Sequence, residues 1–204
     1  VREIEEDGSL LDYLRDTAGI TSVKNGCAEG VCGACTVLID GRTARACVQK
    51  VSRLDGKTVT TVEGLSERER EIYAWAFGAA GAVQCGFCIP GMVMSAKGLL
   101  DANPNPSTAE IKAALKGNLC RCTGYAKIEK AVAMAAEALR DPGFLPPKDP
   151  YDRPYSLGER MPRLDAREKT LGTGKYVEDL KMPGMLYGAA LRPKTPRERI
   201  LEID

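Results

Sequence analysis

Eight cysteines in two sets of four constrain this chain more than any other feature of its sequence. The sets have the spacings C-x4-C-x2-C-x11-C and C-x2-C-x31-C-x-C. Their members are Cys27, Cys32, Cys35 and Cys47 in the first set, and Cys85, Cys88, Cys120 and Cys122 in the second. The chain contains no histidine, so these thiols are its obvious ligands for a soft metal ion. The fold must therefore bring four thiols together twice, and we expect two metal centres.

The first spacing is typical of a cluster with two irons and two bridging sulfides (2Fe-2S). Such a cluster takes four thiolates, two on each iron, and the plant-type ferredoxin loop has this C-x4-C-x2-C pattern. Gly26, Gly30 and Gly33 favour the same interpretation, because glycine lets a backbone bend sharply beside sulfur. A Rieske centre would need two histidines and is excluded. A structural zinc site remains the alternative, although zinc sites usually pair two C-x2-C knuckles.

The second spacing is less specific when it is taken alone, because a zinc site or a redox dithiol can also have it. Its cysteines fall in two turns between expected helices, so converging helix ends would bring them together. By default Gln84 is an ordinary polar residue at a helix end, and Arg121 is a solvated side chain.

Local patterns predict an α+β chain. We expect a first domain over residues 1–64 with a short helix and few strands, and a second over residues 65–140 with about four helices. The expected elements are a helix over 9–19, strands on either side of an Asp40-Gly41 turn, a strand over 58–62, helices opening at Ser66, Pro90 and Ser107, and a helix over 126–140.

The remainder is expected to contain little structure of its own. Residues 141–163 contain six prolines and read as an extended linker. Within residues 164–204, the segments 176–177, 185–191 and 200–203 have strand patterns. These strands are too few to close a core, so we expect residues 164–204 to dock on material outside this chain.

Charge and composition exclude some classes of partner. The net charge of +1 gives no long-range attraction to nucleic acid, and no apolar run approaches the roughly 18 residues of a membrane span. No signal peptide is visible, so we expect a cytoplasmic protein. The chain begins at Val1 rather than methionine, and we expect a trimmed N-terminus with a first strand shortened or missing.

The residues around the cysteines resemble the iron–sulfur region of the molybdenum hydroxylases, the xanthine dehydrogenases and aldehyde oxidoreductases. The resemblance covers roughly residues 1–140 and rests on the segments 26–36, 84–91 and 118–125. Residues 165–176 and 184–187 also resemble the start of that family's molybdopterin-binding portion.

This resemblance implies a fold and two cofactor contacts. The first set would hold a 2Fe-2S cluster in a ferredoxin-like β-grasp domain, and the second would hold another in a four-helix domain. Gln84 and the backbone of Cys122 match positions that contact the pterin, which gives Gln84 a functional interpretation. The molybdopterin (cytosine dinucleotide) itself would be held mainly by another chain or a continuation of this one.

The resemblance also implies a role in electron transfer from molybdopterin through two 2Fe-2S clusters to an acceptor. The expected partners are a molybdopterin-binding catalytic subunit or continuation, and a flavin subunit or ferredoxin as acceptor. The expected enzyme is of the xanthine or purine dehydrogenase type, with a flavin-less aldehyde oxidoreductase as the alternative. No residue in this chain is expected to be catalytic. The competing hypotheses are a zinc-stabilised interaction module and the small subunit of a carbon monoxide dehydrogenase-type enzyme.

Overall fold

The structure is a computed structural model that describes residues 8–147, 154, 156–159, 161, 163–192, 195, 197–199 and 201–202. The expected shortened first strand lies outside the described residues, as does most of the expected strand over 200–203. The described part is a mixture of helices and one small sheet, which confirms the α+β class.

The described helices and strands follow the chain order α1 Leu10–Asp12, β1 Thr36–Ile39, β2 Arg42–Arg45, β3 Val59–Thr60, α2 Glu67–Ala79, α3 Ile89–Ala102, α4 Thr108–Leu115, α5 Ala126–Arg140 and α6 Ala166–Leu171. A π-helical turn, Tyr13–Thr17, continues α1, and Val177–Asp179 is a 3-10 turn. No helix among the described residues is both long enough and apolar enough to cross a membrane.

The sheet has the antiparallel order β2-β1-β3, with the central strand covered on both faces. The predicted turn at Asp40 and Gly41 joins β1 to β2, and both residues have positive φ, as a two-residue hairpin requires. Successive side chains of β1 point to opposite faces. Val37 therefore packs with the leucines of α1, while Leu38 packs into the core of the helical region. The sheet lies between α1 and α3, which positions the first cysteine loop beside the helices.

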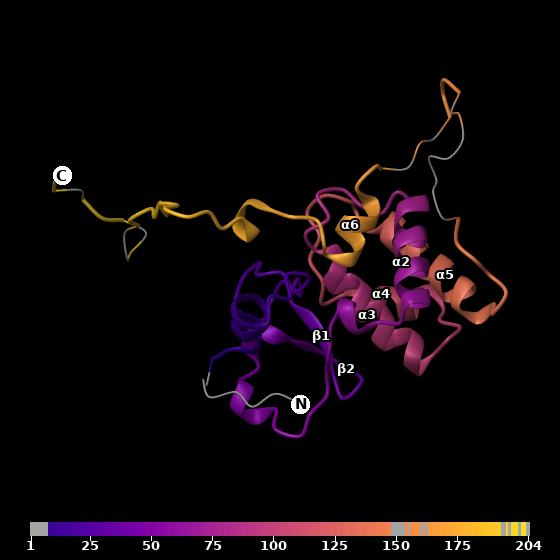
Figure 1. The fold of residues 1–204 in the computed structure, drawn as a ribbon, viewed down its shortest axis with the longest axis horizontal. Helices are drawn as coiled ribbons and strands as arrows, with labels where there is room; N and C mark the ends of the chain where they lie inside the picture. The colour runs from indigo at the N-terminus through magenta and orange to yellow at the C-terminus, as the bar shows by residue number, and fades with distance from the viewer. Residues whose placement is uncertain are drawn as a thin grey trace.

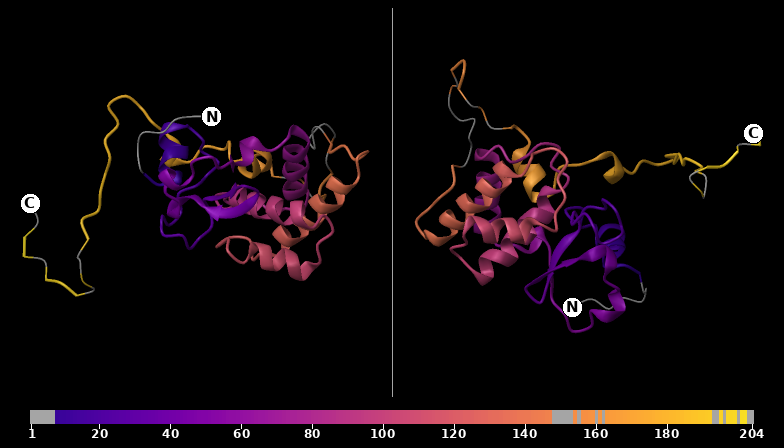
Figure 2. Two further views of the ribbon diagram at one scale, coloured as in Figure 1. Left: turned by 90° about the horizontal axis from the view of Figure 1, so that it is seen from below. Right: turned by 180° about the vertical axis from the view of Figure 1, so that it is seen from behind.

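The helical region combines two helices with side-chain caps, α2 and α4, with α5 and the mostly buried α3. Ser66 and Ser107 both form capping boxes, with Glu69 and Glu110 respectively, as the sequence predicts. The predicted helix over 126–140 has these bounds in the structure. Figures 1 and 2 show α2–α5 gathered on one side of the molecule, with β1, β2 and the cysteine loop beside them.

The segment after residue 163 differs from the sequence-based expectation. No strand is present at 176–177 or 185–191, where the structure has a 3-10 turn and exposed irregular chain. These strand predictions were wrong because apolar alternation favours a strand only where a second strand supplies hydrogen bonds. The helix α6 was not predicted from the sequence. It packs against α2 and buries Ala166 and Leu171 in the helical core.

The expectation that residues 164–204 dock on material outside this chain was therefore wrong for the first part of that segment. Residues 165–180 contact other parts of this chain, with α6 on α2 and α3 and Asp179 on Arg15 and Lys24. Residues 181–192 run away from the rest of the molecule. The second part exposes its apolar side chains, including Leu186 at 94% and Leu191 at 102%.

Candidate metal centres

The first four cysteines meet where a tight loop faces the turn that follows β2. Backbone N–H groups of this loop point at sulfur, and those of Glu29 and Cys32 donate to Cys27 Sγ at 3.4 and 3.5 Å. The Gly30 N–H donates to Cys47 Sγ at 3.2 Å. Gly30 has a φ of +74°, a left-handed conformation that glycine adopts without steric cost. The loop therefore bends back far enough to hold the fourth cysteine of its set.

Within this set the thiols approach each other in twos. The thiols of Cys27 and Cys32 influence each other's pKa, and the thiol of Cys47 influences the pKa of Cys35, so the members of each pair lie close together. Backbone N–H groups, first that of Cys32, lower the pKa of Cys27 to about 6, which favours the thiolate. Burial raises the pKa of Cys35 to about 11. Two adjacent pairs match the two thiolates per iron that a two-iron cluster requires.

The second four cysteines lie in two turns that converge between helices. Cys85 and Cys88 lie in the turn before α3, and Cys120 and Cys122 lie in the turn between α4 and α5. The Sγ atoms of Cys85 and Cys122 are 3.6 Å apart, and the side chains of Cys88 and Cys120 also interact. Burial raises the pKa of Cys88, whereas Cys85 and Cys122 are exposed. This set is again two pairs; among the described residues, no three Cys, Asp or Glu side chains converge as around a single ion.

Tyr125 shapes the second of these turns. Its hydroxyl accepts a hydrogen bond from the Cys120 N–H at 2.7 Å and donates to the Asn118 carbonyl at 3.1 Å. The Thr123 hydroxyl accepts from the Tyr125 N–H and lies 3.2 Å from Cys120 Sγ. Tyr125 has a φ of +68°, which is uncommon for a residue with a bulky side chain. These hydrogen bonds hold that conformation and fix the direction of the Cys120 thiol.

A hydrogen-bond network joins the two cysteine regions directly. The Leu119 N–H donates to the Cys32 carbonyl at 2.8 Å. This hydrogen bond links a cysteine of the first set to the residue that precedes Cys120 of the second set. The buried Asn118 amide donates to the Gly33 carbonyl at 2.9 Å and accepts from the Ser95 hydroxyl at 2.7 Å. No role was predicted for Asn118 or Leu119 from the sequence, because only their position beside Cys120 marks them.

The other residues singled out from the sequence lie at the surface of the second centre. Gln84 is exposed next to the exposed Cys85, and Cys122 is also exposed. Arg121 is exposed, in agreement with its interpretation as a solvated side chain.

The residues present fit two 2Fe-2S clusters. The chemistry of the donor set is suitable, since eight free thiols are arranged as four pairs. Space beside the sulfurs is also preserved: a Cβ at Gly26 would lie 2.8 Å from Cys32 Sγ. Backbone N–H groups already directed at sulfur are the interactions that stabilise a negatively charged cluster.

Comparisons with known protein families agree with this chemistry. Residues 4–70 match a 2Fe-2S iron–sulfur cluster binding domain, and residues 61–133 match a [2Fe-2S] binding domain. The chain is 50% identical over 134 residues to the nicotinate dehydrogenase small FeS subunit of Eubacterium barkeri, covering 65% of this chain and 85% of that subunit. It is 40% identical over 214 residues to the aldehyde oxidoreductase of Megalodesulfovibrio gigas, covering 98% of this chain but only 23% of that enzyme.

Solved structures give the same result. The aldehyde oxidoreductase from Desulfovibrio gigas has a TM-score of 0.75 at 40% identity, over 87% of this chain and 20% of that one. Quinoline 2-oxidoreductase from Pseudomonas putida 86 has a TM-score of 0.62 at 44% identity, over 67% of this chain and 86% of the matched chain. Two cluster-binding domains in this order, on a chain that spans most of a small FeS subunit, show that the protein belongs to the molybdenum hydroxylase family, of which it is the iron–sulfur part.

Proposed function

We propose that each cysteine set holds one 2Fe-2S cluster. Cys27, Cys32, Cys35 and Cys47 would bind the first in a β-grasp domain of residues 1–64. Cys85, Cys88, Cys120 and Cys122 would bind the second in a four-helix domain of residues 65–140. The pairing of thiols in twos supports this assignment for both sets. In the same proposal, residues 141–163 are a linker and residues 164–204 begin the molybdopterin-binding portion.

The hydrogen bond from Leu119 to Cys32 is the observation that carries the electron-transfer role. A 2Fe-2S cluster, when bound, accepts and releases one electron at a time. Leu119 is bonded covalently to Cys120, so a single 2.8 Å hydrogen bond joins a proposed ligand residue of one set to the neighbour of a proposed ligand in the other. The buried Asn118 keeps these two backbones in contact. This chain therefore holds two redox sites at a short and fixed separation.

The exposed side of the second set is the proposed contact with molybdopterin cytosine dinucleotide. Gln84, Cys85 and Cys122 are open to the surface there, while Cys88 is buried behind them. The cofactor would be held by a catalytic subunit or by a continuation of this chain. The first set would face the acceptor, either a flavin subunit or ferredoxin. Free thiols suit the reducing cytoplasm, which is the proposed location.

The substrate would be bound and oxidised in that catalytic portion. The match to aldehyde oxidoreductase extends over 98% of this chain, including the segment after the linker, and this favours an aldehyde substrate. Relatives named for xanthine and nicotinate favour a purine or another N-heterocycle as the second candidate.

Metal and sulfide analysis of the purified chain tests the proposal. We expect about four iron and four acid-labile sulfide per chain, with visible absorption that dithionite bleaches. Cys47→Ser should remove about half of the iron and the EPR signal of one cluster, and Cys122→Ser should remove the other signal. A colourless protein that binds about two zinc ions would instead identify a structural zinc module.

A further inference from the structure

Residues 165–180 pass close to both cysteine regions. A Cβ at Gly172 would lie 2.4 Å from the Ser22 side chain, which precedes the first cysteine loop. A Cβ at Gly86, between Cys85 and Cys88, would lie 2.6 Å from Cβ of Lys169. The segment therefore touches both cysteine regions so closely that a Cβ at Gly172 or at Gly86 would clash at the contact.

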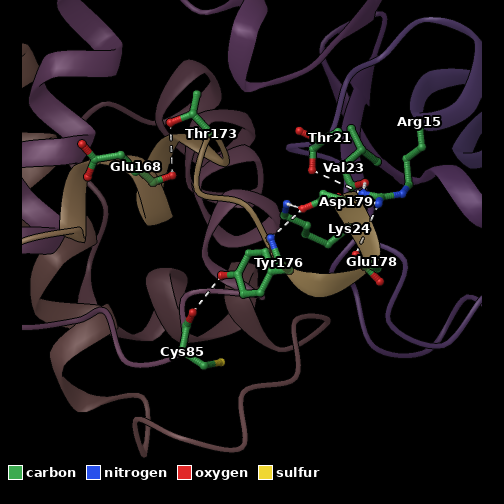
Figure 3. A network of polar contacts seen from close by, with 10 residues as sticks. All are labelled: Arg15, Thr21, Val23, Lys24, Cys85, Glu168, Thr173, Tyr176, Glu178 and Asp179. Atoms are coloured by element: carbon green, nitrogen blue, oxygen red, sulfur yellow. Dashed lines mark hydrogen bonds and ion pairs between the residues drawn. The ribbon is translucent and has the colours of Figure 1, made fainter. Parts of the chain in front are cut away.

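Tyr176 contacts the second cysteine region through its side chain. The Tyr176 hydroxyl donates a 2.7 Å hydrogen bond to the Cys85 carbonyl, as Figure 3 shows. Its ring packs edge-on against Phe87, with 5.2 Å between ring centroids. The ammonium groups of Lys169 and Lys24 lie 3.8 and 4.7 Å from the centre of the same ring. One side chain thus contacts the residue on either side of Gly86 and a lysine of the first region.

Asp179 attaches the same segment to the first cysteine region. Its carboxylate lies 3.3 Å from Lys24 Nζ and 2.8 Å from the Arg15 guanidinium (Figure 3). The side chains of Lys24 and Asp179 are 0% and 4% exposed, so this ion pair is buried. The Tyr176 N–H donates to a carboxylate oxygen of Asp179 at 3.0 Å, which couples the two anchors.

The burial pattern at Val177 and Asp179 is opposite to that of a chain that merely crosses a surface. A passing segment would bury its apolar side chains and leave its carboxylates in water. Here Val177 is 87% exposed, whereas the carboxylate of Asp179 is buried on two cations. Burial of a carboxylate is costly unless the carboxylate is paired with a cation. Lys24 and Arg15 therefore determine where the Asp179 carboxylate lies.

We propose that residues 165–180 form a strap that fixes the two cysteine regions relative to each other. In this strap, Tyr176 is a positioning residue for the backbone of Cys85, and Asp179 anchors the strap to Lys24. The inference rests on the proposed role of Cys85, Cys88, Cys120 and Cys122 as a cluster site. It assigns the strap to the iron–sulfur part of the molecule, although the strap follows the linker in sequence.

Tyr176→Phe tests the strap by removing one hydroxyl while keeping the ring. We expect both clusters to be retained, with a shift in the EPR signal and midpoint potential of the cluster held by the Cys85 set only. Amide hydrogen exchange of peptides covering residues 174–180 should lose roughly tenfold in protection, the effect of one hydrogen bond. Tyr187→Phe is the matched control, because Tyr187 is 76% exposed and lies beyond the strap.

Two separate outcomes overturn the two proposals. If Tyr176→Phe matches Tyr187→Phe in both readouts, the strap does not position Cys85. If the unmodified protein binds no iron, the proposed cluster sites are wrong, but the exchange measurement still decides whether the strap holds. Asp179→Asn provides a second variant for that measurement, with the same direction of change expected in residues 174–180.

Discussion

Neutralising Asp179 should release the strap more than any other single change in it. Asp179→Asn leaves the buried charge of Lys24 beside the Tyr176 ring and a neutral amide, without its carboxylate partner. Lys24 is 0% exposed and its Nζ lies 3.3 Å from the carboxylate that this change removes. Removing one partner of a buried ion pair costs about 3–5 kcal/mol, mostly because the other charge remains unpaired.

The lower end of that range applies in this protein. Burial, the largest cause, holds the pKa of Lys24 below its ordinary value, so the unpaired lysine can lose its proton to limit the cost. Asparagine also keeps an oxygen that accepts from the Tyr176 N–H. We therefore expect about 3 kcal/mol, which corresponds to roughly 150-fold in the protection of strap amides.

Hydrogen–deuterium exchange of peptides covering residues 174–180 measures this free energy as local opening. The change Lys24→Met provides the comparison, because Asp179 then keeps Arg15 at 2.8 Å and no charge is left alone. We expect Lys24→Met to cost less than about 1.5 kcal/mol and to rescue most of the Asp179→Asn loss in the double variant. Unchanged protection in Asp179→Asn, or a double variant as unprotected as Asp179→Asn alone, would refute the buried-pair argument.

Two further changes test the contacts around this arrangement. Gly33→Ala should cost about 3 kcal/mol or more in stability, because a Cβ there would lie 2.2 Å from the Gly117 carbonyl; Gly41→Ala, at a similar φ but in open space, should cost only about 1 kcal/mol. The midpoint of denaturant-induced bleaching compares the two, and equal midpoints would contradict the steric argument. The hydrogen bond from Arg167 lowers the pKa of Glu71 below its ordinary value of 4.5. The stabilisation of α6 docking by this ion pair is therefore present at neutral pH and is lost as pH falls below about 4.5 through the folded-state pKa of Glu71. Both side chains are partly exposed, so exchange in α6, corrected for intrinsic rates, should show less than about 1 kcal/mol between pH 6 and pH 4, and Glu71→Gln should abolish that change.

Local signals predicted the parts of the fold that local interactions stabilise. Ser66 and Ser107 cap their helices through residues three positions later, so the sequence alone contains both partners of each capping box. Asp40 and Gly41 specify the hairpin turn in the same way. These elements appear in the structure at or close to their predicted positions.

The strap escaped prediction because its partners are distant in sequence. Asp179 is 155 residues from Lys24, and Tyr176 is 91 residues from Cys85. The apolar pair Tyr176-Val177 favoured a strand, but no second strand lies beside it among the described residues. A hydrophobic pattern cannot predict a segment held by a buried charge, since it places Asp179 in water and Val177 in the core, the reverse of what occurs.

The contact between the two cysteine regions has a sequence signal of a different kind. Its central hydrogen bond joins backbone groups of Leu119 and Cys32, which every non-proline residue possesses, so no side chain marks it. Glycines mark it instead: a Cβ at Gly91 would lie 2.5 Å from the Gly33 carbonyl. Gly91 lies in the first turn of α3, where it costs helix stability of up to about 1 kcal/mol relative to alanine. A glycine inside a helix beside a cysteine turn is therefore a sign that another backbone passes within contact distance. Here that backbone is the loop around Gly33, which carries the first cysteine set.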